Sequence, residues 1–350
     1  MNKHLIALAV AAATLSGAAS AAQVYSDDSS SLAIGGRVEA RALLSDQAQN
    51  KNDSVLQQKT DKEVTDISRV RVNIDAKTQI ADGVQGIGFY EREFKDDNSN
   101  DENRYMYAGV NSDQYGQLVY GKADGSLGML TDFTDIMAYA GSVVGGTKLA
   151  VADRTTNNLA YTGNFGDLTF KANYVFAGAD YDSAGNKTDV HGFSTAAKYN
   201  VADTGLALGL GYGEQRDQNG VNTHKARSEQ TFATASYTVG DLYFGGLYKY
   251  GRRDGQNLVT DKVTDTQGYE FAAAYTAGKA VFTTTYGFMK DEKAHNEYDE
   301  LANALAIDGT YYFNSNFRTY ASYTFNMLDK NKVGKVAASD EFVLGARYDF

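Results

Sequence analysis

Arginine recurs in two early segments of the chain, at Arg37 and Arg41 and again at Arg69 and Arg71. In an extended strand, side chains two or four positions apart point to the same face, so each pair of arginines shares a face. Arg104 stands on the corresponding face of a later segment. Charged side chains gathered at close quarters in a narrow, wet passage select among solutes. These five arginines would therefore give the strands a basic face, able to select among solutes in any narrow, wet passage that the strands enclose.

Three carboxylates fall in one long polar stretch and are candidates to face the arginines. Asp132, Asp135 and Asp153 occupy the longest polar connection of the chain, 124–155. Long connections without secondary structure of their own are often functional. Arginines facing carboxylates across confined water would set up a transverse field, which orients dipolar solutes and penalises apolar ones.

Local pairing is the alternative interpretation of the arginines. Glu39 and Asp75 lie on the same faces as the arginines of their segments. If they neutralise those arginines, the charged faces only keep the lumen wet.

The segments that carry these residues are predicted to be strands with one apolar face. Ile34, Val38 and Ala42 alternate with Arg37 and Arg41. Short Gly, Asn and Asp clusters typical of hairpin turns recur along the chain. They are 81–83, 111–113, 164–167, 202–205, 239–241, 277–279 and 314–316. Longer polar stretches alternate with them, at 46–65, 95–103, 124–155, 178–189, 216–228, 253–265, 291–302 and 329–339.

Seven short turns and eight long loops predict sixteen strands. An even strand number with short turns at one end and long loops at the other is typical of outer-membrane barrels. The last segment, Glu341–Phe350, alternates apolar and polar residues and ends on an aromatic residue. We expect it to pair with the first strand, Leu32–Leu44, and close an all-β, 16-stranded antiparallel transmembrane β-barrel.

The N-terminus has the form of a secretory signal. Lys3 and His4 precede the apolar run Leu5–Leu15, and Ala19-Ser20-Ala21 is a small-x-small cleavage site. Cleavage after Ala21 would leave residues 22–350 as a single barrel domain. The remaining chain is one charge unit more negative than the formal −11 of the full sequence. It has no apolar stretch near the roughly 18 residues of a spanning helix.

Composition argues against several other functions. The chain has no Cys, Pro or Trp, but 25 Tyr, 17 Phe and 35 Gly. Without Cys there are no disulfides, thiolate nucleophiles or Cys-based metal sites. Hydrolases of the outer membrane need His beside Ser or Asp, whereas His191, His224 and His295 fall in or next to predicted loops without a recognisable motif. The acidic charge disfavours nucleic acid, and no cofactor or metal is expected.

A soluble all-β protein, a substrate-specific channel and an adhesin remain as alternatives. A soluble sandwich would not be expected to alternate loop length so regularly. A substrate-specific channel needs aromatic residues along the lumen. The aromatic residues placed from the sequence face lipid or lie in girdles at the strand ends, as predicted for Tyr105, Tyr107, Tyr120, Tyr161, Phe165, Tyr311, Phe313 and Phe317. External loops could add a binding role for host or phage proteins.

Six segments of the chain form a recognisable set: 22–25, Gly36–Arg41, 127–137, 150–154, 317–320 and 347–350. They resemble the Gram-negative general diffusion porins, and specifically the OmpU-type porins. The resemblance runs from Met1 to Phe350. It implies a homotrimer in the Gram-negative outer membrane, among lipids and lipopolysaccharide, that lets small hydrophilic solutes diffuse passively. It also implies that the third external loop folds into the lumen and narrows it. The residues expected at this pore constriction are Arg37, Arg41, Arg69, Arg71, Arg104, Asp132, Asp135 and Asp153.

The resemblance bears on individual site residues as well. Arg37, Arg69 and Arg104 match basic positions of the enteric general porins, and Asp135 matches an acidic position on their third loop. Where those porins carry a Pro-Glu pair after the loop aspartate, this chain reads Ala138-Tyr139. The net charge and the acidic loops predict weak cation selectivity, because acidic groups concentrate cations at the mouth.

Overall fold

The computed structural model describes residues 21–45, 64–96, 101–178, 180–181, 187–219, 225–254, 264–292 and 298–350. The N-terminal segment 1–20, to which most of the predicted signal belongs, lies outside this part. Two α-helices of four residues each, α3 (Gly128–Thr131) and α4 (Lys330–Val333), and the 3₁₀ helix η1 (Ala150–Ala152) are found within it. No helix of the described residues is long and apolar enough to cross a membrane.

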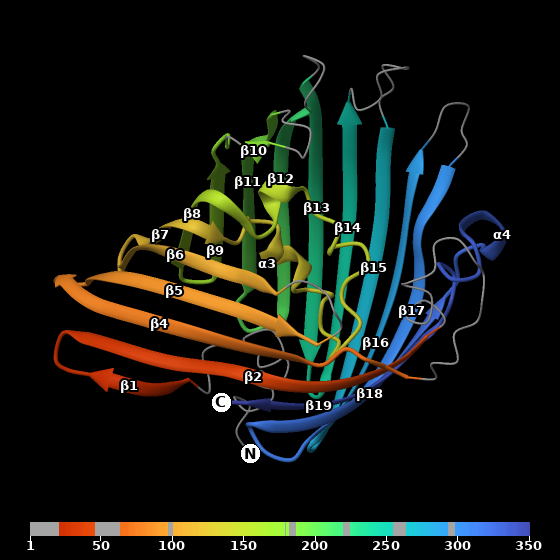
Figure 1. Cartoon of the computed structure of the whole chain (residues 1–350), viewed down its shortest axis with the longest axis horizontal. Coiled ribbons are helices and arrows are strands. Elements are labelled where there is room, and N and C mark those ends of the chain that lie inside the picture. The colour runs from red at the N-terminus through yellow and green to blue at the C-terminus, as the bar shows by residue number, and fades with distance from the viewer. Residues whose placement is uncertain are drawn as a thin grey trace.

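Sixteen antiparallel strands of eight residues or more form one closed ring within the described residues (Figure 1). The predicted strand number is therefore confirmed. The strands are β2 (Ser30–Ser45), β4 (Arg69–Ala81), β5 (Val84–Lys95), β6 (Glu102–Ser112), β7 (Gly116–Ala123), β8 (Thr155–Phe165), β9 (Leu168–Val175), β11 (Lys187–Val201), β12 (Leu206–Asn219), β13 (Lys225–Val239), β14 (Leu242–Asp254), β15 (Thr264–Ala277), β16 (Ala280–Glu292), β17 (Tyr298–Tyr312), β18 (Phe317–Asn326) and β19 (Glu341–Asp349). Three short strands, β1 (Ala22–Ser26), β3 (Thr65–Asp66) and β10 (Asp180–Tyr181), extend the sheet.

The first and last long strands close the ring, as predicted. β19 pairs with β2 from Glu341 opposite Ser45 to Asp349 opposite Arg37. Phe350 continues the pairing, because its backbone N–H and C=O both bond to Gly36, at 3.0 and 2.9 Å. Figure 1 shows the two strands side by side near the C-terminus. Within the described residues, every long strand therefore pairs with a neighbour on each side, so the ring has no open edge of the kind that lipid would not tolerate.

The seven short turns all lie where the sequence predicts them, each between two consecutive long strands. Gly83, Gly166, Gly240 and Gly278 in these turns have φ between 57° and 65°. This left-handed conformation costs Gly little and other residues more, so the Gly fixes the place of each of these four turns.

At the other end of the barrel, the strands run further than predicted. The predicted loop 216–228 contains the end of β12 and the start of β13, and the predicted loop 291–302 similarly overlaps β16 and β17. Arg227 bonds across the extended hairpin to Glu214, at 2.8 Å, and pairs with Glu229, at 3.2 Å. Cross-strand charge pairs support a hairpin although its residues are polar. Residues 46–63, 97–100, 179, 182–186, 220–224, 255–263 and 293–297 of the other connections lie outside the described part.

Side chains alternate between the two faces of the sheet as predicted. On the outward face Val38, Leu344 and Tyr348 are 48–49% exposed, whereas the neighbouring Arg37 and Arg347 of the inward face are 5–6% exposed. The outward face is thus apolar and open, and the inward face carries the charged residues, the reverse of a soluble protein with an apolar core.

Candidate pore constriction

A ladder of alternating charges runs across the inward faces of β2 and β4. The Glu39 side chain is almost fully buried and accepts a hydrogen bond from Arg69 Nε at 2.7 Å. Arg37 Nε lies 3.8 Å from the same carboxylate. The hydroxyl of Tyr320, on β18, donates to the other carboxylate oxygen at 2.9 Å. Glu39 is therefore held by two arginines and a tyrosine.

The ladder continues onto β5 and β6. Arg71 bonds to Glu93, which also lies 3.4 Å from Arg69, and Arg104 bonds to Glu91 at 2.6 Å. The sequence analysis did not single out these two glutamates. Their alternation with Arg92 along β5 is the signal that could have found them.

Local pairing is confirmed for Glu39 and wrong for Asp75. Asp75 pairs with Lys77 on its own strand, at 3.0 Å, instead of with an arginine. Four of the five predicted arginines thus have a carboxylate partner on the wall, and Glu91 and Glu93 take the place that was expected for Asp75.

Arg41, the fifth arginine, contacts the long connection between β7 and β8. Its guanidinium lies 5.5 Å from the ring centre of Tyr139, and its Nε donates to the backbone carbonyl of Ile67 at 3.2 Å. The Tyr139 hydroxyl lies 3.5 Å from a carboxylate oxygen of Glu341 on β19. The tip of this connection therefore reaches the strands that close the barrel.

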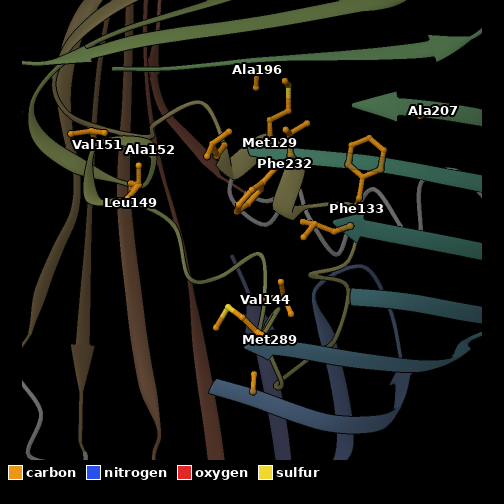
Figure 2. Packing of buried hydrophobic residues seen from close by; sticks show 14 of the residues in the cluster. Met129, Phe133, Val144, Leu149, Val151, Ala152, Ala196, Ala207, Phe232 and Met289 are labelled. Carbon is orange, nitrogen blue, oxygen red and sulfur yellow. The ribbon is translucent and has the colours of Figure 1, made fainter. Parts of the chain in front are cut away.

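The connection between β7 and β8 packs against the wall along an apolar seam. Leu127, Leu130 and Phe133 recur every third residue around α3 and are buried in one cluster with Phe232 of β13. Figure 2 shows Met129 and Phe133 beside Phe232. Gly211 of β12 makes room for this packing, since a Cβ there would lie 2.6 Å from Leu127.

Inward polar side chains hold the same connection through its backbone. Glu270 of β15 and Asp308 of β17 accept from the N–H groups of Val144 and Ala138, at 2.8 and 2.9 Å. Lys249 of β14 donates to the carbonyl of Thr147 at 2.7 Å. Further bonds of this kind are Ser126 N–H to Asn173 and Ser194, Leu149 N–H to Gln230 and Val151 N–H to Gln215. The backbone polar groups of this irregular segment are thus satisfied by the wall.

The three predicted aspartates lie on this connection and are exposed. Asp153 pairs with Lys148 at 3.5 Å. Asp132 interacts electrostatically with Lys171 and Lys198 of the wall. Among the described residues no ion pair joins the three aspartates to the five arginines. The structure brings the arginines together with glutamates and places the aspartates apart from them.

Arg154, at the end of the connection, also joins the charged wall. Its guanidinium bonds to Glu102 at 3.1 Å and lies 5.2 Å from the ring centre of Tyr105. Lys122 reaches the same carboxylate at 3.3 Å. Arg154 therefore adds a basic group to the wall near Arg104, and both guanidinium groups lie over the Tyr105 ring.

The expected girdle position is wrong for Tyr105 and Tyr107. Both lie on the inward face of β6, opposite Glu91 and Phe89 of β5. The pairing of the two strands is irregular between Glu91 and Arg92, where a bulge adds one residue to β6 and inverts the alternation that Arg104 predicted. Tyr120, Phe165, Tyr311 and Phe313 are 46–52% exposed, in keeping with the predicted outward girdle.

Comparison with known proteins decides the family. A family model described as Gram-negative porin matches residues 7–331. Porin-like protein L of Photobacterium profundum is 57% identical to the chain, and outer membrane protein U of Vibrio parahaemolyticus is 41% identical, each over the whole of both sequences. The chain belongs to the Gram-negative porins. This porin is thus a protein of the outer membrane, and its family is one of channels.

Solved structures agree with this porin in fold. The Salmonella typhi OmpF in complex with daunomycin is 21% identical, with a TM-score of 0.76 over 94% of this chain and all of the other. The trimer form of OmpT from Vibrio cholerae is 20% identical, with a TM-score of 0.69 over 92% of this chain and all of the other. At these identities the likeness concerns the barrel alone.

Proposed function

We propose that this porin forms a water-filled channel through which ions and small hydrophilic solutes diffuse passively. The observation that carries the proposal is the polarity of the closed ring. The inward faces of β2, β4 and β5 hold arginines and glutamates, whereas Val38, Leu344 and Tyr348 on the outward face are apolar and open. Charged residues on the inside and apolar residues on the outside suit a wet lumen surrounded by lipid.

The connection 124–155 constricts this channel by folding into the lumen. Its bonds to inward side chains on β9, β11 to β15 and β17 support this assignment. The chain has no cysteine, so Asp135→Cys places a single thiol on the connection. A bulky charged thiol reagent should then reduce the single-channel conductance of the variant and leave the parent channel unchanged. Full conductance after complete labelling would contradict the constriction.

The channel prefers cations weakly. Glu39, Glu91 and Glu93 neutralise much of the arginine wall, so the arginines do not impose an anion preference. The formal net charge of −11 acts in the same direction at the mouth. In a planar bilayer under a potassium chloride gradient, the reversal potential should indicate cation preference. A reversal potential of the opposite sign would refute it.

Asp135→Asn tests which residue supports this preference. Loss of one exposed carboxylate from the constriction should lower the ratio of cation to anion permeability, because the lumen loses one negative charge. Glu229→Gln, on the outward face beside Arg227, is the matched control and should leave the ratio unchanged. An equal reversal potential in Asp135→Asn and parent would mean that Asp135 does not face the lumen.

The functional unit is a homotrimer that lies among outer-membrane lipids and lipopolysaccharide. The trimer form described for OmpT of Vibrio cholerae supports this assembly. On this chain, the small outward residues Ala40 and Ala42 of β2 would let two barrels approach closely. In the same bilayer recordings, a trimer closes in steps of one third of the full conductance. Single-step closure of every channel would argue against it.

Export requires removal of residues 1–21 as a signal peptide. The start of β1 at Ala22, directly after the proposed cleavage site, supports this boundary. The intact mass of the protein purified from outer membranes should correspond to residues 22–350. A mass that includes Met1–Ala21 would refute the cleavage.

A further inference from the structure

Three aromatic rings gather on the inward wall next to the charge ladder. Phe89 of β5 lies 5.8 Å from Tyr105 and 5.6 Å from Tyr107 between ring centres, and the two tyrosines are 6.3 Å apart. We call these three residues the inner aromatic patch. Along β5, Phe89 is two positions from Glu91 and four from Glu93, toward the end with the short turns. A solute that has passed the charge ladder would therefore meet the patch next.

The patch faces the lumen side of the sheet and is partly exposed there. Phe89 shares its face with the buried Glu91 and Glu93, and it pairs with Asp75 on β4. On the neighbouring strands the outward residues are Met106 and Tyr120, which are 55% and 52% exposed. The lumen-facing side of such barrels is mostly polar, and the inward Phe232 is buried beneath the connection between β7 and β8. A Phe ring without polar atoms at this place departs from the pattern, and such departures mark functional sites.

The charges around the patch cancel one another. Asp75 pairs with Lys77, Arg104 pairs with Glu91, and Arg154 and Lys122 share Glu102. With Asp124, which accepts from Tyr105, four acidic groups thus stand beside four basic ones. The patch therefore has no charge preference that would favour an ionic solute. It offers instead an apolar surface with carboxylate acceptors and guanidinium donors at its rim.

The Tyr105 hydroxyl fixes one end of the patch. It donates to the carboxylate of Asp124 at 2.9 Å, and Arg154 lies over its ring. The faces of Tyr107 and Phe89 are the parts of the patch without a stacked guanidinium among the described residues. An incoming ring would stack on these two.

We propose that the inner aromatic patch is a weak binding site for pyranose sugars in the lumen. A pyranose has a face of C–H groups that packs on an aromatic ring and a rim of hydroxyls that both donate and accept hydrogen bonds. The carboxylate acceptors and guanidinium donors around the patch match that rim, because a sugar hydroxyl can donate to the first and accept from the second. The inference rests on the proposed channel and adds a solute class to it.

Single-channel recordings with maltose test the site. Maltose added on the side of the short turns should interrupt the current in a saturable manner. Mannitol, which carries hydroxyls but no ring, should only lower the current in proportion to solution conductivity. Phe89→Ser should raise the maltose concentration for half-maximal interruption at least threefold, and Phe89→Tyr, which keeps the ring, should restore it. Tyr120→Ser on the outward face is the matched control and should behave as the parent.

Two results would overturn the proposal while the channel function stands. The first is a conducting parent channel that maltose does not interrupt. The second is interruption of Phe89→Ser at the same maltose concentrations as the parent, which would move the site elsewhere in the lumen. Absence of any channel in the parent protein is a different failure, because it refutes the proposed function on which the sugar site rests.

Discussion

At the scale of residues, the charged wall is built from pairs that sequence alone resolves only in part. Alternation identifies the face of Arg37, Arg69 and Arg71, because a strand has a fixed period of two. It does not identify partners, which depend on the register between strands. Glu93 meets Arg71 because the two pair across β4 and β5, a relation that no local pattern contains.

Glu39 is the residue whose replacement tests the wall most directly. In Glu39→Gln the guanidinium groups of Arg37 and Arg69 lose their shared carboxylate, and the lumen wall gains one net positive charge. We expect the cation preference to fall or reverse, as measured by reversal potential. The charge-assisted bond to Arg69 is worth on the order of 2 kcal/mol. The heating temperature at which the barrel unfolds, followed by its shift in mobility in gel electrophoresis, should therefore also fall.

If Glu39 only stabilises the barrel, its replacement should change the unfolding temperature and leave the reversal potential unchanged. Tyr320→Phe removes the hydroxyl that donates to Glu39 and keeps every charge, so it is the matched variant. It should lower the unfolding temperature and leave the reversal potential unchanged. If Glu39→Gln also keeps the reversal potential of the parent, the carboxylate does not contribute to the field in the lumen.

At the scale of elements, turns were predictable and strand pairing irregularities were not. Each short turn is determined by local residues. Gly83, for example, adopts a positive φ that Gly tolerates at little cost. The bulge in β6 depends on how β5 and β6 pair, and it places Tyr105 on the lumen face although alternation from Arg104 predicts the opposite. The extended hairpin ends were missed because polar composition indicates loops only as a correlation.

The connection between β7 and β8 is held at its tip by Tyr139, and this is testable. In Tyr139→Ala the stack with Arg41 and the contact with Glu341 are lost. A stack of this kind is worth about 1 kcal/mol, so the tip should leave the wall roughly five times more often. Single-channel records should then show more frequent brief current fluctuations.

Tyr312→Ala provides the comparison for this variant. Arg318 lies 5.4 Å from the ring centre of Tyr312, so the same kind of stack is lost, but both residues belong to wall strands. The current through this variant should remain as steady as in the parent. Equal fluctuations in both variants would assign the effect to the loss of any such stack, and not to release of the connection.

At the scale of the whole molecule, the closed ring follows from the count of turns and from the last strand. An even number of strands brings both chain ends to one rim, and a terminal strand with one apolar face must then pair with the first. Those relations are global consequences of simple local signals, which is why the sequence predicts the barrel better than its wall contacts. The contact of Phe350 with Gly36 completes the seam.

Deletion of Phe350 should therefore impair assembly more than conduction. The deletion removes two backbone hydrogen bonds to Gly36. It also removes the aromatic ring that packs on this glycine, so closely that a Cβ on Gly36 would lie 2.9 Å from it. Each bond is worth about 1 kcal/mol, and both act only once the ring closes. The yield of heat-resistant trimer should fall severalfold, whereas the channels that do form should conduct as the parent does, because Phe350 belongs to the outward parity of β19.

Phe350→Tyr keeps the ring and both bonds and should assemble normally. Normal trimer yield after the deletion would show that β19 closes the barrel without its last residue.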